Sequence, residues 1–250
     1  MENKKISKSR NKRFIYRLGA KDNDIKHFKH LLPMDISKVV EPFGGSYAVC
    51  RCVYYEDKYD KYVNDNSVDI IEVFNNLEET HKLYLEWGKH VLKNKGEYTK
   101  KIVEDWNKLD GNEIIKKYIV ANAISNGYHV KTIPNVDDGR EFIKKVKFTS
   151  YDYKDCMMTH MDNKDCFIFL DPPYMFSNNK SYSTQFEVSD CTDYLIDILE
   201  MFKSCKCKIM LVINDLKITR HLFRDYNFID YVKTYGLSKR KERHLVITNY

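Results

Sequence analysis

Short apolar runs separated by longer amphipathic segments form the main pattern of this chain. Residues 166–170, Cys-Phe-Ile-Phe-Leu, carry no polar side chain, which is typical of a central parallel strand covered on both faces. Residues 209–213, Ile-Met-Leu-Val-Ile, have the same character. Shorter runs predict further strands at 38–41, 61–65, 147–150 and 244–248.

Between these runs, apolar residues recur at the spacing of helices. One helix is predicted over 22–32, where Pro33 closes it, and another follows Ser67, a residue type that can cap a helix. A third is predicted over 192–202, and residues 48–54 fit either a helix or a strand. Strands that alternate with helices predict an α/β fold with a mostly parallel, twisted sheet.

The segment 75–145 differs from the rest of the chain in its pattern of apolar and charged residues. Trp87 and Trp106 recur near helical spacing among many Lys and Glu residues, and several glycines interrupt the pattern. This composition predicts a small helical lobe. We therefore expect residues 1–74 and 146–250 to form one α/β unit into which the lobe is inserted.

Composition sets limits on where the protein works. With 250 residues, 43% of them hydrophobic, the chain can bury one good core with a smaller appended lobe. No stretch of about 18 apolar residues occurs, and no apolar run follows the basic N-terminus, so neither a membrane span nor a signal peptide is expected. We expect a cytoplasmic protein, a monomer or weak dimer with no obligatory protein partner.

Seven cysteines are present, none of them in a Cys-x-x-Cys pair. The pairs Cys50/Cys52 and Cys205/Cys207 lie in sequence that is typical of strands, where residues two apart share one face and rarely chelate zinc alone. No metal site is therefore expected. The favoured interpretation is free, mostly buried thiols in a reducing compartment.

The net charge of +6 is unevenly distributed. Ten Lys or Arg residues stand against three acids within the first thirty positions, so a polyanionic partner is one interpretation. A solvated, lysine-rich tail is the other, and the charge pattern alone does not separate them.

The most specific chemical signal is Asp171-Pro172-Pro173-Tyr174, which directly follows the apolar run 166–170. Ligands of open α/β sheets bind at the carboxyl ends of strands, so this segment stands where a site is expected. An amino group held by the Asp171 carboxylate and the Pro172 carbonyl would turn its lone pair toward an electrophile, while the tyrosine ring lies against a planar base. The alternative is a rigid turn that merely ends the strand.

Other segments narrow the interpretation. Residues 14–21, Phe-Ile-Tyr-Arg-Leu-Gly-Ala-Lys, are similar to F-L-K-W-A-G-G-K, and residues 40–49, Val-Glu-Pro-Phe-Gly-Gly-Ser-Tyr-Ala-Val, to E-P-F-x-G-x-G-A-V. Residues 64–66, Asn-Asp-Asn, resemble the start of A-D-I-N. Together with Asp-Pro-Pro-Tyr, and in this order, these segments resemble the motifs of the Dam-type DNA adenine methyltransferases. Residues 212–215 and 245–250 are similar to two late strands of that family.

The resemblance implies a Rossmann-like class I methyltransferase fold and S-adenosylmethionine as cofactor. Gly45 would let the backbone approach the methionine part of the cofactor, Lys21 would contact its carboxylate, and Asp65 would bind its ribose. Asp171 would lie between the cofactor and the target base. The cofactor-binding residues implied are Arg17, Gly19, Lys21, Glu41, Pro42, Phe43, Gly45, Asp65, Asp152 and Asp171, and the catalytic residues are Asp171, Pro172, Pro173 and Tyr174.

Three positions depart from the family pattern. Arg17 stands where the family has tryptophan, Tyr47 replaces the last glycine of the cofactor loop, and Ala20 replaces a glycine of the first motif. These departures leave open a catalytically weak or dead DNA-binding homologue.

Double-stranded DNA is the partner that the resemblance implies. The segment 75–145 stands where the family carries recognition elements, and residues 178–183 follow the catalytic motif. The candidate DNA-binding residues are Lys93, Lys95, Lys116, Lys117, Asn126, Tyr128, Lys131 and Tyr182. Methyl transfer to cytosine or to RNA stays open as an alternative. An NAD-type binder is disfavoured because Gly44-Gly45 lacks the G-x-G-x-x-G spacing.

Overall fold

A seven-stranded sheet organises the chain, whose computed structural model describes residues 21–93, 100–125, 136–174, 188–234 and 241–250. The strand order is β3-β2-β1-β4-β5-β7-β6. Strands β3, β2, β1, β4 and β5 are parallel neighbours, whereas β7 runs antiparallel to both β5 and β6. The strands are β1 Lys38–Glu41, β2 Asp60–Asn64, β3 Val146–Thr149, β4 Cys166–Leu170, β5 Lys208–Asn214, β6 Asn227–Thr234 and β7 Lys241–Thr248. The predicted Rossmann-like, mostly parallel α/β fold is confirmed.

Both faces of the sheet are covered by helices. Along β4, Phe167 and Phe169 enter one apolar cluster, while Ile168 and Leu170 enter another on the opposite face. This explains why the strand is apolar at every position rather than at alternate ones. The first face packs against α2 Ile25–Phe28, α3 Ala48–Cys52 and α4 Val68–Asn75, and the second against α9 Tyr153–His160, α10 Val188–Ser204 and α11 Lys217–Leu222.

The order of the strands reverses between β1 and β4, which lie side by side. From β1 the chain proceeds outward to β2 and β3, and from β4 it proceeds to β5 on the other side. Crevices at such a switch point, outside the carboxyl ends of the strands, are the usual ligand sites of open α/β sheets. The loop after β1 and the Asp-Pro-Pro-Tyr segment after β4 therefore meet at this place.

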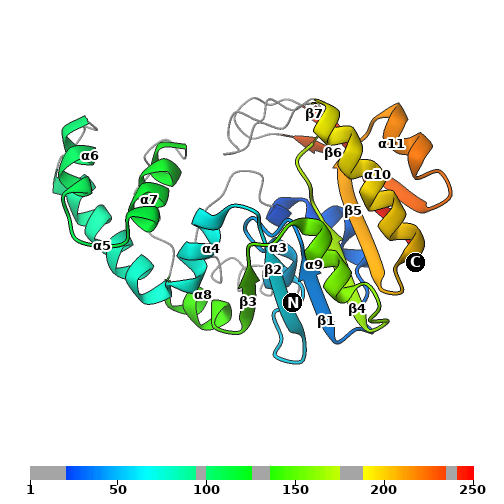
Figure 1. Cartoon of the computed structure of the whole chain (residues 1–250), viewed down its shortest axis with the longest axis horizontal. Helices are drawn as coiled ribbons and strands as arrows, with labels where there is room; N and C mark the ends of the chain where they lie inside the picture. Colours follow the sequence, from blue (N-terminus) through cyan, green and yellow to red (C-terminus); the bar gives the residue numbers. More distant parts are fainter. Residues whose placement is uncertain (1–20, 94–99, 126–135, 175–187, 235–240) are drawn as a thin grey trace.

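The described residues between β2 and β3 are mainly helical. Beyond α4 they form α5 Leu77–Lys93, α6 Lys100–Asn107, α7 Glu113–Ser125 and α8 Val136–Ile143, and Figure 1 shows α5, α6 and α7 extending away from the sheet. Trp87 and Trp106 pack edge to face at 5.1 Å between ring centroids in this region. The division of the chain into 1–74 with 146–250 and an inserted lobe at 75–145 stays a prediction.

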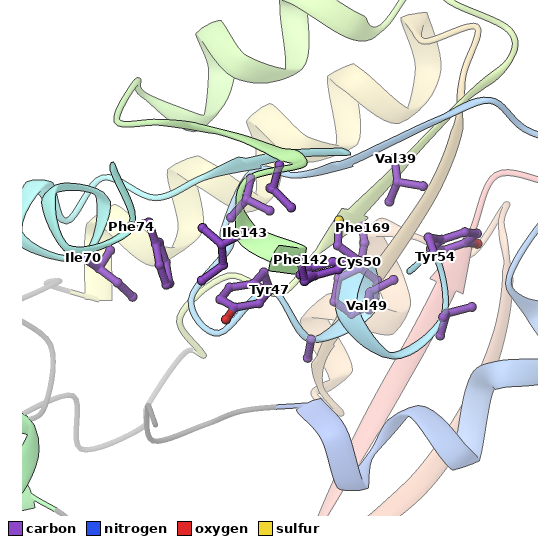
Figure 2. Close-up of a cluster of buried hydrophobic side chains, with 14 of the residues drawn as sticks. Val39, Tyr47, Val49, Cys50, Tyr54, Ile70, Phe74, Phe142, Ile143 and Phe169 are labelled. Atoms are coloured by element: carbon purple, nitrogen blue, oxygen red, sulfur yellow. The ribbon is translucent and has the colours of Figure 1, made fainter. Parts of the chain in front are cut away.

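Tyr47, one of the departures from the family pattern, is fully buried although its backbone is left-handed at φ +44°. Its ring contacts Phe74 and Phe148 edge to face and stacks on Phe142, at centroid distances of 5.1, 6.0 and 6.0 Å. Figure 2 shows the ring within this apolar cluster. Positive φ is unfavourable for a bulky residue, so ring burial offsets a local strain that glycine would avoid.

Two local predictions were wrong. Residues 22–32 do not form one helix: the chain makes a 3₁₀ turn at Lys21–Asn23, the short α2 and a second 3₁₀ turn at Lys29–Leu31. The side chains of Asp22 and Asp24 there serve ion pairs with Arg51 and Lys233 instead of capping one helix. The assignment of the cysteine pairs to strands was also wrong, since Cys50 and Cys52 lie in α3, and Cys205 and Cys207 lie between α10 and β5.

Six described cysteines are free, four of them buried, as predicted. Within the described part of the chain, no cluster of three or more His, Cys, Asp or Glu side chains has the arrangement of a metal site. None of the helices in that part has the length and apolar character needed to cross a bilayer.

Candidate active site

Asp171 begins the segment that follows β4 and forms an ion pair with Lys21, at 2.6 Å between Lys21 Nζ and Asp171 Oδ1. The Tyr174 hydroxyl donates to the same oxygen at 3.2 Å. Lys21 Nζ also lies 5.0 Å from the centre of the Tyr174 ring, a cation–π distance. A residue from the start of the described chain thus joins the two ends of the Asp-Pro-Pro-Tyr segment.

The remaining acceptors of this segment are unevenly used. The Tyr194 hydroxyl of α10 donates to the Pro173 carbonyl. Within the described part of the chain, neither Asp171 Oδ2 nor the Pro172 carbonyl accepts a hydrogen bond. Because Pro172 and Pro173 have no N–H, these two residues present acceptors only. Two of them therefore stay available to an incoming donor.

Two buried ion pairs, Lys21–Asp171 and Asp24–Lys233, connect the N-terminal turn to the sheet. Lys21 is only 4% exposed, and burial lowers the pKa of its ammonium despite the opposing effect of Asp171. Asp24 of the same N-terminal region pairs with Lys233 of β6 at 2.6 Å, and Asp24 is equally buried. Charges removed from water are costly unless paired, so these pairs hold the N-terminal turn against the sheet in one position.

His244 of β7 supports the Tyr174 ring from behind. The two rings meet edge to face at 4.9 Å, and Tyr231 of β6 lies 5.3 Å from the imidazole. Burial, together with the charges of Lys21 and Lys233, lowers the pKa of His244 to about 4. The imidazole is therefore neutral near pH 7 and acts as an aromatic wall rather than as a charge.

The loop after β1 contains two glycines with different constraints. At Gly44, a Cβ atom would lie 2.3 Å from Val63 Cγ1 and 2.9 Å from the Asn64 carbonyl, so only glycine lets the loop approach β2. At Gly45 the backbone is left-handed, with φ +48°, and a Cβ atom would meet nothing within 4 Å. Gly45 therefore presents bare backbone to an open space at the carboxyl edge of the sheet.

Asp65 follows β2 and is 8% exposed. Its Oδ2 accepts from the backbone N–H of Gly45 at 2.9 Å, and its Oδ1 accepts from that of Ser67 at 3.0 Å. The carboxylate thus ties the loop after β1 to the start of α4.

Other predicted cofactor residues also have structural contacts. Asp152 caps α9 by accepting from Lys154 N at 2.8 Å, while its carboxylate is exposed. Pro42 is buried, and the Phe43 ring stacks on Tyr153 at 5.1 Å. Arg17 and Gly19 lie outside the described residues.

Glu41, the last residue of β1, is fully enclosed. Its Oε1 accepts from the backbone N–H of Cys50 in the first turn of α3, at 2.6 Å. Burial raises the pKa of this carboxyl to about 7 against the lowering effect of the backbone N–H groups. The side chain therefore faces the start of α3, where a negative charge is favoured but poorly solvated.

This raised pKa predicts a pH-dependent stability. Between pH 4.5 and 7 the native Glu41 holds a proton that the unfolded chain has lost, so the free energy of unfolding falls as pH rises through this window. Glu41→Gln keeps the Cys50 contact but cannot ionise. We expect its stability relative to wild type to rise by about 3 kcal/mol between pH 4.5 and 8, measured by urea unfolding. The exposed Glu200→Gln is the control, and an equal change there would contradict the assignment.

The predicted DNA-binding lysines fall into different classes. Lys116 requires a correction: it is 1% exposed, and its ammonium donates to the carbonyls of Leu109 and Asn107 at 2.6 and 3.2 Å. It holds the turn between α6 and α7 and does not present its charge to a phosphate. Lys117 is exposed on α7. Nothing is described of the Lys93 side chain, and Lys95, Asn126, Tyr128, Lys131 and Tyr182 lie outside the described residues.

Sequence reasoning did not find Tyr194, His244 or Asn64. A histidine in the apolar segment His244-Leu-Val-Ile-Thr and a polar residue directly before Asp65 were the available signals. Neither signal indicates which residue the side chain contacts, because the contacts join segments that are distant in sequence.

Comparison with known proteins agrees with this geometry. Residues 123–237, which include the Asp-Pro-Pro-Tyr segment, match the family model of the D12 class N6 adenine-specific DNA methyltransferases. The chain is similar to this family over 115 of its 250 residues. It is also 25% identical over 263 residues to the type II methyltransferase M.CviBI of Paramecium bursaria Chlorella virus NC1A, a match that covers 93% of this chain and 97% of the relative.

The family match and the viral relative support one class of reaction. A D12 class methyltransferase acts on the N6 atom of adenine in DNA, so the prediction of an adenine-specific enzyme is confirmed, and the cytosine, RNA and NAD alternatives are not supported. The family match begins at residue 123, whereas the similarity to the viral relative extends over most of the chain, including the N-terminal third that holds Lys21 and the loop after β1.

Proposed function

We propose that this protein binds S-adenosylmethionine above the carboxyl ends of β1, β2 and β4, and methylates N6 of an adenine flipped out of a specific duplex DNA sequence. The observation that carries the proposal is a pair of acceptors that no described residue uses, Asp171 Oδ2 and the Pro172 carbonyl, at the switch point of the sheet. The exocyclic amine of adenine has two N–H groups, which is the number needed to engage both.

The residues around the loop after β1 suit the cofactor. Gly45 exposes its backbone to open space, and Asp65 stands at the end of β2, where an acidic side chain suits a contact to the ribose hydroxyls. When bound, S-adenosylmethionine supplies an electrophilic methyl group on a sulfonium. We assign Pro42, Phe43 and the edge near Asp152 to the walls of this site.

The chemical help that the protein gives is mainly positioning. An adenine amine that donates to Asp171 Oδ2 and the Pro172 carbonyl has its lone pair directed out of the base plane. S-adenosylmethionine, held by the loop after β1 and Asp65, would supply the methyl group to which this lone pair bonds, with the electron pair of the broken C–S bond left on sulfur. The amine nitrogen becomes cationic during the transfer, so the Asp171 carboxylate beside it stabilises the transition state and afterwards offers an acceptor for the released proton.

For Lys21 we propose a role other than the contact with the cofactor carboxylate that the resemblance implied. Its ammonium contacts Asp171 and the Tyr174 ring. We assign it to holding Oδ1 so that Oδ2 faces the amine. The Tyr174 ring, supported by His244, would stack on the flipped base.

DNA contact by residues of the 75–145 segment remains part of the proposal. Lys117 is an exposed candidate for a phosphate contact, and Lys93, Lys95, Asn126, Tyr128, Lys131 and Tyr182 stay proposed on sequence grounds.

The proposal is tested by incubating the protein with methyl-labelled S-adenosylmethionine and genomic DNA, followed by nucleoside analysis. We expect label in N6-methyladenine, concentrated at one short sequence motif when the modified sites are mapped. Matched duplexes that replace the target adenine with cytosine, or DNA with RNA, should stay unlabelled. Absence of labelled adenine under conditions where the folded protein binds DNA would refute the proposal.

A further inference from the structure

Asn64, the last residue of β2, uses every hydrogen-bonding position of its side chain. Nδ2 donates to the Tyr151 carbonyl at 3.0 Å and to the Pro42 carbonyl at 3.1 Å. Oδ1 accepts from the Tyr151 N–H at 2.8 Å and from the Thr149 hydroxyl at 2.9 Å. The residue is 1% exposed.

An amide side chain has two donor hydrogens and two acceptor lone pairs, and all four are satisfied here. Rotating the amide by half a turn would place Nδ2 against the Tyr151 N–H and Oδ1 against two carbonyls. The observed orientation is therefore the only one that the surroundings accept, and the side chain acts as a rigid connector rather than as an adaptable contact.

The connector joins the segments that follow three neighbouring strands. Pro42 opens the loop after β1, Asn64 itself ends β2, and Tyr151 lies in the turn after β3, next to Asp152. Two backbone hydrogen bonds link the same three strands. Gly44 N donates to the Asn64 carbonyl at 2.6 Å, and Asp65 N donates to the Thr149 carbonyl at 3.1 Å. The Asn64 side chain therefore bridges the loop after β1 and the turn after β3, two segments that border the proposed cofactor site.

We propose that Asn64 is a positioning residue for the cofactor: it fixes the spacing between the loop after β1 and the Tyr151–Asp152 turn, and so sets the affinity for S-adenosylmethionine. This inference rests on the function proposed above. The motif that residues 64–66 resemble has alanine at this position, and a methyl group could make none of the four bonds. None of the four hydrogen bonds of Asn64 involves the Asp-Pro-Pro-Tyr segment, so we expect its effect to be confined to cofactor binding.

Two substitutions, Asn64→Ala and Asn64→Asp, test whether the hydrogen bonds of this side chain set the affinity for the cofactor. Alanine removes all four bonds, and aspartate keeps the shape but turns a carboxylate oxygen toward the carbonyls of Pro42 and Tyr151. For both we expect the Kd for S-adenosylmethionine, measured by calorimetric titration, and its KM to rise at least about tenfold. The kcat at saturating cofactor and the KM for DNA should stay within about threefold of wild type. Thr149→Val removes only one of the four hydrogen bonds and should raise the KM for S-adenosylmethionine by a smaller factor. This milder variant tests the inference even if the Asn64 variants fail to fold.

Asn249→Ala is the matched control. Asn249 also bridges backbone groups, donating to the Cys207 carbonyl at 3.0 Å and accepting from Ile209 N at 2.7 Å, but it lies at the opposite end of β5 from the site. It should lower the melting temperature without changing the KM for the cofactor. An equal rise in KM for Asn249→Ala, or an unchanged KM in both the Asn64 and Thr149 variants, would overturn the inference. The proposed function is judged separately, on whether wild type transfers methyl groups to adenine.

Discussion

Asp171→Asn is expected to lower the single-turnover rate of adenine methylation by about 10³-fold, because it replaces one acceptor of the amine with a group that has no charge to offset the developing cation. Oδ1 is held by Lys21 and Tyr174, so the side chain is fixed before substrate arrives. An amide there also presents N–H groups toward a donor or a lysine, which disturbs this arrangement further. The measurement is rapid-quench methylation of a duplex containing the mapped target site.

The comparison needs a variant of the same chemical type away from the site. Asp225→Asn is suitable because Asp225 is largely exposed, with only a long contact to Arg224 at 3.8 Å. We expect this control to methylate at the wild-type rate. DNA binding by Asp171→Asn should also persist, since phosphate contacts rather than this carboxylate provide most of the affinity. If Asp171→Asn retained more than about a tenth of the rate, the role assigned to this carboxylate would be wrong.

Arg51→Met is expected to cost about 3–5 kcal/mol of folding free energy, the largest effect on stability that we predict. Arg51 of α3 is fully buried and pairs with Asp22 at 2.5 Å, and the Asp22 side chain is itself only 7% exposed. Removing the guanidinium alone leaves a carboxylate in the interior with its main cation gone. The cost is measured by urea unfolding at pH 7.

The double variant Arg51→Met with Asp22→Asn separates the buried charge from the lost packing. It should recover much of the stability, because neither charge is then left without its counterpart. Lys145→Met gives the surface comparison: its pair with Asp57 is about half exposed or more on both sides, and we expect a loss below about 1 kcal/mol. A similar small loss for Arg51→Met would show that the interior pair is not what fixes α3 against the N-terminal turn.

The ion pair between Arg51 and Asp22 also affects the active site. Asp22 directly follows Lys21, so the Arg51 pair anchors the turn that presents Lys21 to Asp171. The variant should therefore also weaken catalysis when assayed below its unfolding transition. This link between a stability contact and the site joins residues from three separate stretches of the chain.

Local sequence determined the strands and the chemical motif. The apolar runs at β4 and β5 specify central strands because both faces of each must be covered, and that requirement is visible without knowing the partners. Asp171-Pro172-Pro173-Tyr174 indicated a ligand site because its consecutive prolines and its position after a buried strand limit what the backbone can present, and its resemblance to the Dam-type motif implied the reaction. Short-range order of this kind depends on neighbours in the chain, so the sequence carries it directly.

Tertiary structure alone decided which partners the buried polar groups found. Lys21 meets Asp171, 150 positions later, and Asn64 meets Tyr151 across 87 positions. Lys116 turned out to be an interior residue, and residues 22–32 broke into short turns. In each case a charged or polar group was removed from water and had to be satisfied by whatever the topology placed beside it. Composition and spacing do not encode that neighbour, because it is selected only when the strands take their order in the sheet.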